Sequence, residues 1–249
     1  MCFSSTASFA AAAFLSVEGL IAVRVCPTRR HTALACIPLL FAVQQICEGV
    51  LWWKLGASPF NKASSPFAYL FLFFAFGVWP AYLPAALALF ESGARRRLLV
   101  GFSGFGVALG AYLLACLTLR PTDACFSHGS LYYWVQIDAP FKTAMPLVYL
   151  AVVVAPFVVS SMPGTSFVAV ALGTSFVVSA AFSRAGFLST WCFFAAVLSG
   201  VVALALRAEG RAATWRRRQV RYTTGPHELR DRNVRAHEGL RDDAGARGG

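Results

Sequence analysis

Charged residues are scarce in this sequence, and their scarcity excludes a soluble globular protein. Only 13% of the 249 residues are charged, whereas 57% are hydrophobic, and the mean hydropathy is +0.61. There are only three lysines, and eleven of the 19 arginines lie from Arg207 onward. This composition is typical of an integral membrane protein. No nucleic-acid-binding domain is expected, because the basic block lacks an aromatic-lined sheet or a recognition helix.

Several chemical motifs are also missing. The seven cysteines include no C-x-x-C pair, and no Cys/His cluster has zinc spacing, so neither a metal site nor a cofactor is expected. Only His31 and His128 precede the basic block, and both fall in predicted loops on opposite faces of the membrane. The last apolar segment has no lysine for a Schiff base, which excludes the usual retinal photoreceptor. The first twelve residues carry no Lys or Arg, unlike a secretory signal peptide.

Seven apolar segments are long enough to cross a bilayer, since each is close to the ~20 residues that a ~30 Å hydrocarbon core requires. Backbone polar groups must be satisfied internally in lipid, so each span should be a helix. The sequence therefore predicts an all-α integral membrane bundle of seven transmembrane helices over residues 1–206. The Arg-rich segment 207–249 is expected to be a disordered cytoplasmic tail. The predicted spans lie near 5–25, 32–54, 66–90, 97–119, 143–161, 164–183 and 187–206.

The arginines predict an orientation, because Lys and Arg favour cytoplasmic loops. With the N-terminus outside, most of the basic residues fall inside once the tail is counted, so the C-terminus is predicted inside, at the cytoplasmic membrane. Arg216, Arg217 and Arg218 follow the last span directly. They could bind anionic lipid headgroups at ~1 kcal/mol each, although a simple topology anchor is the preferred interpretation.

A polar cluster interrupts the second segment, in the stretch Phe41-Ala-Val-Gln-Gln-Ile-Cys-Glu-Gly-Val-Leu-Trp-Trp53. Gln44 and Glu48 are four residues apart and share a helix face, and Gln45 lies beside them. A carboxyl inside a membrane costs on the order of 2–3 kcal/mol and usually faces a bundle interior or a water-filled cavity. Glu48 should lie roughly 9 Å below the outer surface, at 1.5 Å of rise per residue. We expect an outward-opening polar pocket, the alternative being a carboxyl that serves helix packing only.

The link from Arg120 to Lys142 is the longest between predicted spans and mixes aromatic residues with His128 and Asp138. Loops of this length are often lids or binding loops, although an interfacial aromatic belt is an equal alternative. The residues expected to contact a ligand come from this loop and from the spans below it. They are Gln44, Gln45, Glu48, Trp52, His128, Tyr132 and Trp191.

Two further patterns concern cysteine and glycine. Cys2 and Cys192 both fall at the predicted outer surface, where a disulfide between them is possible, with Cys125 as a competing partner and unpaired packing thiols as the alternative. The fourth segment carries a small-residue face suited to close helix packing. Its glycines are Gly101, Gly104, Gly106 and Gly110.

Four blocks of sequence together suggest a family. They are Met1-Cys-Phe-Ser-Ser-Thr-Ala-Ser-Phe9, Ile37-Pro-Leu-Leu-Phe-Ala-Val-Gln-Gln-Ile-Cys-Glu-Gly49, Phe71-Leu-Phe-Phe-Ala with Trp79-Pro80, and Trp191-Cys-Phe-Phe-Ala-Ala196. Over residues 1 to about 206 the chain resembles an uncharacterised family of bacterial multi-pass membrane proteins, a domain of unknown function. That family carries no established activity, so the resemblance supports the choice of site and not of a reaction. It implies that family motif positions are occupied by Cys2, Gln45, Glu48, Trp79, Pro80, Trp191 and Cys192.

The resemblance also bears on the long loop. His128 falls where the family tends to carry a Gly-His-Ser-like sequence, but the order here is Ser127-His128-Gly129, which is a departure from the pattern.

Three functions remain open at this point. The leading hypothesis is the binding or translocation of a small molecule or proton at Glu48. The second is an integral membrane enzyme acting on lipid, with Glu48 and His128 as an acid–base pair. The third is a structural or accessory subunit. Membrane lipids are the expected surroundings, and the sequence does not identify a protein partner.

Overall fold

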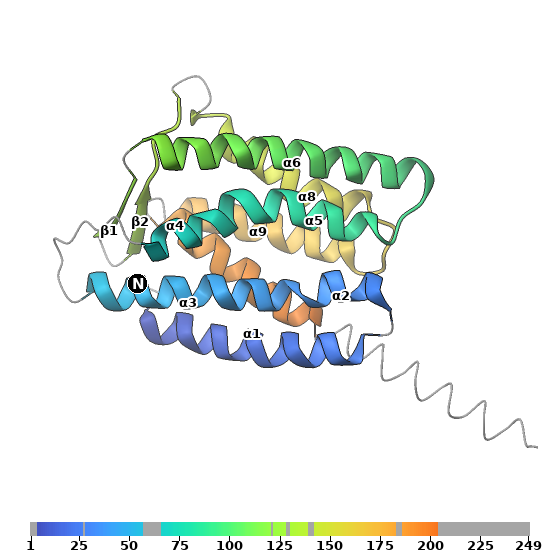
Figure 1. Ribbon diagram of the computed structural model, residues 1–249, viewed down its shortest axis with the longest axis horizontal. Helices are drawn as coiled ribbons and strands as arrows, with labels where there is room; N and C mark the ends of the chain where they lie inside the picture. Colours follow the sequence, from blue (N-terminus) through green and yellow to red (C-terminus); the bar gives the residue numbers. More distant parts are fainter. Residues whose placement is uncertain are drawn as a thin grey trace, which may run out of the picture. The chain divides into compact units, whose positions relative to one another are not determined.

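The structure is a computed structural model that describes residues 4–26, 28–56, 66–120, 122–127, 130–138, 142–182 and 186–203. These residues form a helical bundle with one small β-hairpin (Figure 1). The elements are α1 (Ser5–Val25), α2 (Arg29–Ala35), α3 (Ile37–Gly56), α4 (Pro66–Leu72), the π-helical η1 (Phe73–Val78), α5 (Trp79–Ala88), α6 (Gly93–Leu119), β1 (Asp123–Ser127), β2 (Ser130–Trp134), α8 (Met145–Val159), α9 (Thr165–Phe182) and the helix Phe187–Ala203.

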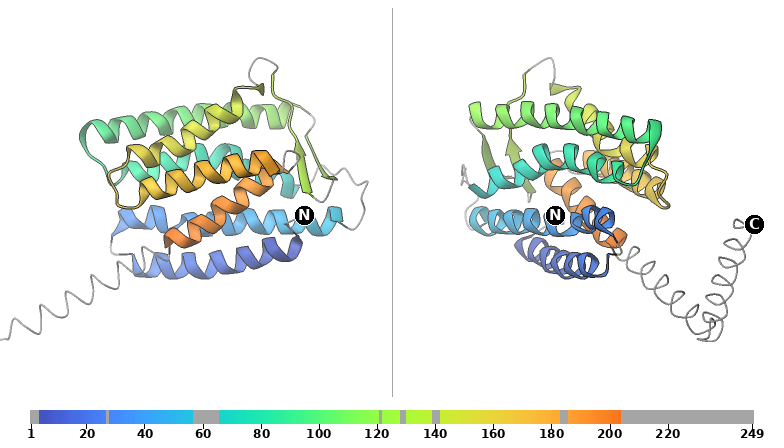
Figure 2. Two further views of the ribbon diagram at one scale, coloured as in Figure 1. Left: turned by 180° about the vertical axis from the view of Figure 1, so that it is seen from behind. Right: turned by 45° about the vertical axis from the view of Figure 1, so that its right-hand side comes forward.

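The helices pack against one another in neighbouring pairs. α1 lies against α3, α5 against α6 and α8, and α8 against α9. The helix Phe187–Ala203 crosses the bundle obliquely, as its orange ribbon shows (Figure 2). α1 and α3 approach closely because glycines lie between them: a Cβ on Gly19 would meet the Leu39 side chain at 2.6 Å, and one on Gly49 would meet the Phe9 ring at 2.8 Å.

Within the described residues, five helical segments are long and apolar enough to cross a membrane. They are Ser5–Val25, Arg30–Leu55, Pro66–Ala88, Gly93–Leu119 and Thr165–Phe182. Two shorter apolar helices, Met145–Val159 and Phe187–Ala203, coincide with the fifth and seventh predicted spans. The prediction of a helical protein with several segments able to cross a membrane is therefore confirmed, and five of the seven predicted spans reach a spanning length.

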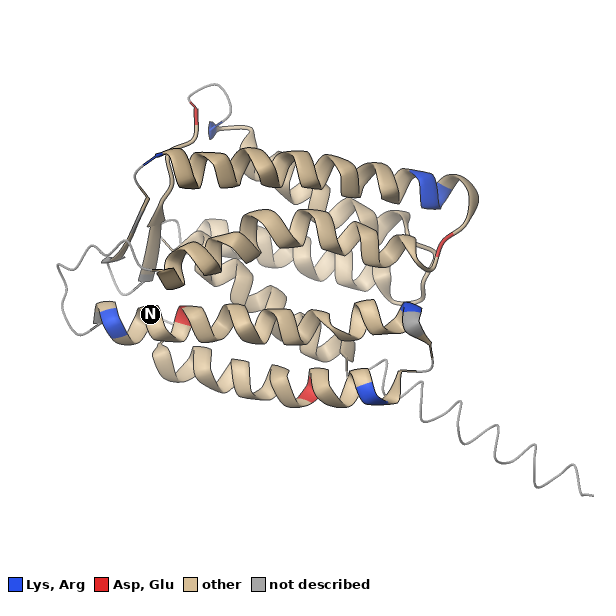
Figure 3. Cartoon of the chain, in the orientation of Figure 1, with Lys and Arg blue, Asp and Glu red and all other residues tan. Residues whose placement is uncertain are grey.

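The charged residues that the structure describes lie mainly at the two ends of the bundle (Figure 3). Arg24 is in the last turn of α1, and Arg95, Arg96 and Arg97 are in the first turns of α6; we call this the arginine end. Lys54 is in the last turn of α3, at the opposite end, where the β-hairpin lies, which we call the hairpin end. The apolar length of the helices thus separates two polar surfaces, as a bilayer requires.

The β-hairpin is an element that the sequence did not predict. Its two strands are antiparallel, with Ala124 opposite Tyr133 and Phe126 opposite Leu131. Successive side chains of a strand point to opposite faces, so Leu131 and Tyr133 are buried while Trp134 is exposed. The buried face joins the core cluster of Leu51, Phe71, Leu72 and Cys192. The hairpin therefore closes one end of the bundle and inserts Tyr133 into it.

A proline-bearing helix and a glycine-bearing helix fit against each other. Pro80 and Pro84 lie in α5 and have no N–H to donate to the carbonyls of Phe76 and Pro80, four residues earlier. A Cβ on Gly106 of α6 would lie 1.9 Å from the Pro80 carbonyl oxygen, and one on Gly110 would lie 3.0 Å from that of Phe76. The same two carbonyl oxygens are thus the atoms nearest to a Cβ added at Gly106 and at Gly110.

The predicted small-residue face on this helix is therefore correct in part. Gly106 and Gly110 mediate the close approach, but a Cβ at Gly101 or Gly104 would meet no described atom within 4 Å. The prediction was wrong for these two because glycine spacing alone does not reveal which side of a helix has a neighbour.

Candidate functional site

Gln44 of α3 joins four segments of the chain through its amide. Trp79 Nε1 donates a hydrogen bond to Gln44 Oε1 at 2.8 Å, and Gln44 Nε2 donates to the carbonyl oxygen of Phe71 and to Cys192 Sγ, both at 3.5 Å. The side chain is fully buried, and the Trp79 ring stacks on Phe41 at 3.9 Å. Both amide donors and the acceptor are therefore used, which makes Gln44 a structural link between helices.

Glu48 lies one turn further along α3 and is 1% exposed. Its carboxyl accepts a hydrogen bond from the Ser189 hydroxyl and another, at 3.0 Å, from Gln45 Nε2. Among the described residues the ion pair that forms is Arg120–Asp138, so no described cation balances Glu48. A buried carboxyl is costly unless it is hydrogen-bonded, and here two neutral donors supply those bonds. We call Gln45, Glu48 and Ser189 the Glu48 cluster.

Tyr133 brings the hairpin to this cluster. Its ring stacks on Phe71, with centroids 4.9 Å apart and planes 4° from parallel. Burial, and after it the charge of Glu48, raises the pKa of the Tyr133 hydroxyl well above its ordinary value of 10.0, so the two side chains lie within electrostatic reach. The Tyr133 hydroxyl and Gln45 Oε1 have no hydrogen-bond partner among the described atoms. Such orphaned buried groups are uncommon, and an ordered water or ion is one explanation for them.

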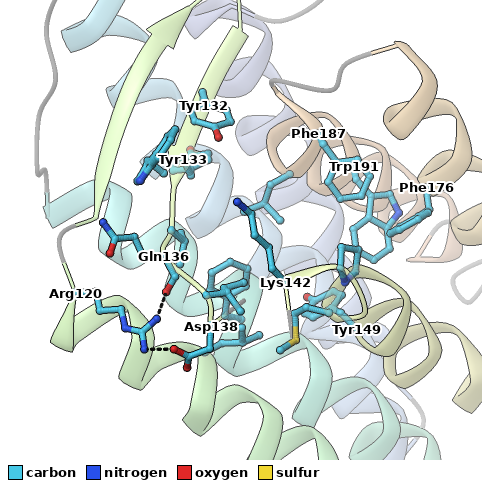
Figure 4. A pocket seen from close by; sticks show the side chains of 18 residues that line it. Arg120, Tyr132, Tyr133, Gln136, Asp138, Lys142, Tyr149, Phe176, Phe187 and Trp191 are labelled. Atoms are coloured by element: carbon cyan, nitrogen blue, oxygen red, sulfur yellow. Dashed lines mark hydrogen bonds and ion pairs between the residues drawn. The ribbon is translucent and has the colours of Figure 1, made fainter. Parts of the chain in front are cut away.

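A pocket of about 520 Å³ lies at the hairpin end. Its volume is in the range of sites that hold small molecules. Tyr132 and Tyr133 stand on one side and Trp191 and Phe187 on the other, with Lys142 between them (Figure 4). The other lining residues are Phe76, Leu113, Arg120, Trp134, Val135, Gln136, Ile137, Asp138, Met145, Pro146, Tyr149, Phe176 and Leu188.

The aromatic wall is held by polar contacts to the backbone. Trp191 Nε1 donates to the Leu172 carbonyl at 3.3 Å, and the Tyr149 hydroxyl donates to the Ala75 carbonyl. Trp191 also meets Tyr149 and Phe176 edge to face, with centroids 5.6 Å and 5.2 Å away. These contacts fix the orientation of the ring that the pocket presents.

The charged residues of the pocket differ in their partners. Arg120 donates to Asp138 Oδ1 at 2.5 Å and to the Gln136 carbonyl at 3.2 Å (Figure 4). The hydrogen bond from Arg120 holds the pKa of Asp138 below its ordinary value of 3.8, because it stabilises the ionised carboxylate. The side chain of Lys142 forms no hydrogen bond or ion pair with any described residue. The lining therefore carries one cation that is not neutralised by a described partner.

The helix Phe187–Ala203 connects the pocket to the Glu48 cluster. Leu188 and Trp191 line the pocket, and Ser189 between them donates to Glu48. Tyr133 makes the same connection from the hairpin, since it lines the pocket and belongs to the core cluster that contains Cys47, the residue before Glu48. The buried carboxyl and the pocket thus share a wall.

The structure places the predicted ligand-binding residues in two groups. Tyr132 and Trp191 line the pocket, whereas Gln44, Gln45 and Glu48 are buried behind its wall. Trp52 belongs to the core cluster around Leu51 and is not among the lining residues. His128, the proposed partner of Glu48, lies outside the described residues, as do Cys2, Arg216, Arg217 and Arg218.

The predicted disulfide concerns two described cysteines. Cys192 is a buried free thiol that accepts the hydrogen bond from Gln44, and Cys125 is also free. Because Cys2 is outside the described residues, its pairing stays a prediction. Among the described residues, no three His, Cys, Asp or Glu side chains gather as a metal site.

Sequence reasoning missed Tyr133, Ser189 and Lys142. The alternation of Leu131 and Tyr133 with outward-facing residues was a signal for a strand that could have identified the first. Nothing in the sequence distinguishes Ser189 from the other serines of the apolar segments, since its role depends on which helix meets α3. Lys142 was read only as a loop cation.

Comparison with known proteins gives one match. No curated protein and no solved structure matches the chain. A family model matches residues 1–218, which include every described residue of the pocket and of the Glu48 cluster. The resemblance inferred from the sequence blocks to an uncharacterised family is thereby confirmed. The chain belongs to the family of unknown function DUF6629.

Proposed function

We propose that this protein crosses the cytoplasmic membrane seven times, with its N-terminus outside, and binds a small amphipathic molecule in the pocket at its outer end. The five long apolar helices and the two shorter ones support seven spans. The arginines at the end opposite the hairpin support the orientation, because basic residues favour the cytoplasmic side. The pocket then opens on the outer side.

The observation that carries the binding proposal is the shared wall between the pocket and the Glu48 cluster. An ionisable residue inside a span is a functional-site hypothesis by default, because a carboxyl buried there without a cation is costly. Tyr133 lines the pocket with a hydroxyl that has no described partner, close to Glu48. We propose that a polar group of the bound molecule, or a water that it orders, connects to Glu48 through Tyr133. Glu48 is thus the buried polar end of the binding site.

The test is the substitution Glu48→Gln in the full-length protein. Glutamine keeps the shape and an acceptor for the Ser189 hydroxyl, but it can neither carry a charge nor exchange a proton. We expect unchanged folded yield and a loss of the small molecules that co-purify with the protein, measured by extraction and mass spectrometry. Glu18→Gln is the matched control, because Glu18 is a buried acid of α1 that does not line the pocket.

Two outcomes would contradict the proposal. A drop in folded yield for Glu48→Gln but not for Glu18→Gln would show that Glu48 serves packing. An unchanged set of co-purified molecules in both variants would show that Glu48 does not take part in binding.

A further inference from the structure

We propose that the molecule bound in the pocket is an anionic amphiphile, with one carboxylate or phosphate group held by Lys142 and an apolar chain against the aromatic wall. The inference rests on the proposed function and adds the chemical class of the ligand. It follows from the charges of the lining, the position of the cation and the nature of the opposite wall.

The charge of the lining favours an anion. The cations are Arg120 and Lys142, and the acid is Asp138. Arg120 and Asp138 neutralise each other through a direct ion pair, whereas Lys142 has no described side-chain partner. An anionic ligand would supply the missing partner, and hydrogen bonds between charged groups are about twice as strong as neutral ones. A cationic ligand would meet a net positive lining.

The N-terminus of α8 also favours an anionic ligand. Lys142 precedes this helix by three residues, and Met145 and Pro146 of its first turn line the pocket. No side chain caps this terminus. A helix N-terminus carries a partial positive charge and favours nearby anions, so it reinforces Lys142 at the same side of the pocket.

The opposite wall suits an apolar chain. Phe176, Phe187 and Trp191 form it, and Trp191 Nε1 is already bonded to a backbone carbonyl, so the ring offers the pocket only its apolar surface. Figure 4 shows these rings facing Lys142 across the pocket. The site therefore has a charged side and an apolar side, which matches a molecule with a head and a tail. Its place at the end of the spans is the depth at which lipid headgroups lie.

The experiment measures saturable binding of radiolabelled dodecanoate to the full-length protein in a neutral detergent. Displacement by dodecyl phosphate, by methyl dodecanoate and by acetate separates the parts of the proposal. We expect dodecyl phosphate to displace the probe, methyl dodecanoate to do so about tenfold more weakly because it lacks the charge, and acetate to fail because it lacks the chain.

Two lysine variants provide a matched pair. Lys142→Gln should weaken dodecanoate binding about tenfold, the loss expected for one hydrogen bond to a charged group. Lys54→Gln removes a cation from the same end of the bundle, where Lys54 lies over the Phe67 ring at 5.1 Å and outside the pocket, and should leave binding unchanged. Ile137→Trp, which fills the pocket from an irregular segment, should abolish binding of both the acid and the ester.

The outcomes separate this inference from the proposed function. The proposal of an anionic head group is wrong if the ester binds as well as the acid, or if Lys142→Gln and Lys54→Gln weaken dodecanoate binding equally. In either case, loss of binding in Ile137→Trp would still support the pocket as the binding site. If acetate displaces the probe, the site binds free anions and the amphiphile is wrong. If no chain binds saturably to the wild-type protein, both proposals fail.

Discussion

The orphaned hydroxyl of Tyr133 yields a prediction in which stability and binding change in opposite directions. Tyr133→Phe removes the hydroxyl and keeps the ring that stacks on Phe71. An unsatisfied buried polar group costs ~1–3 kcal/mol, so its removal should stabilise the ligand-free protein by about 1 kcal/mol. For a chain of this size that corresponds to a rise in melting temperature of about 2–4 °C.

Ligand binding should nevertheless weaken, because the same hydroxyl is proposed to connect the bound molecule to Glu48. The loss of one hydrogen bond predicts roughly three- to tenfold weaker dodecanoate binding. Glu48→Gln should then have little additional effect on binding in the Tyr133→Phe background, since both substitutions break one connection. The assays are thermal unfolding of the purified protein without ligand and radioligand binding to the single and double variants.

The adjacent tyrosine provides the control. Tyr132 lines the same pocket but is only partly buried, and it packs edge to face on Trp134 at 5.9 Å. Tyr132→Phe should therefore not raise the melting temperature. The reasoning is refuted if Tyr133→Phe destabilises the ligand-free protein by more than about 1 kcal/mol, the net worth of an ordinary hydrogen bond. It is also refuted if Tyr133→Phe and Glu48→Gln weaken binding additively.

Two further predictions test the packing of α6 and the charge of the pocket. Gly106→Ala should destabilise the protein by ~1–3 kcal/mol in a thermal unfolding assay, the cost of overpacking a close contact, because its Cβ would lie 1.9 Å from the Pro80 carbonyl oxygen. Gly101→Ala is the control and should be neutral or stabilising in that assay. Equal effects of the two substitutions would contradict the close approach of α6 to α5. Asp138→Asn frees the charge of Arg120 and should tighten dodecanoate binding several-fold at low salt, whereas weaker binding would show that the ion pair serves mainly to shape the loop.

Much of the fold could be predicted because a membrane-spanning helix requires a long apolar run that is visible in the sequence. A span needs about twenty consecutive apolar residues, so each helix leaves a continuous signal. The proline-bearing segment from Pro66 to Ala88 is continuously apolar and was therefore predicted as one span, even though η1 interrupts its regular hydrogen bonding. The hairpin has a weaker sequence signal, since each strand has only five residues and only one face is buried.

Around Glu48, the buried polar residues were predicted only where they lie on one helix. Gln44, Gln45 and Glu48 were found because their spacing is local and their polarity is exceptional in a span. Ser189, which bonds to Glu48, and Tyr133, which lies within the electrostatic reach of Glu48, come from distant parts of the chain, and neither is unusual in its own segment. Contacts of this kind depend on how helices pack, which periodicity does not determine.

The buried glutamines of α3 differ in whether all of their hydrogen-bonding groups have partners among the described atoms. Gln44 uses both of its donors and its acceptor on protein atoms, so its burial is explained by packing alone. Gln45 donates to Glu48 but leaves its oxygen without a described partner, and Tyr133 leaves a hydroxyl. The Gln45 oxygen can accept a hydrogen bond, and the Tyr133 hydroxyl can donate one. A water molecule or a ligand hydroxyl can donate to the first and accept from the second. A helix that needed polarity only for packing would satisfy all of these groups, as Gln44 does, so the Gln45 oxygen and the Tyr133 hydroxyl support the proposed binding site rather than a purely structural link.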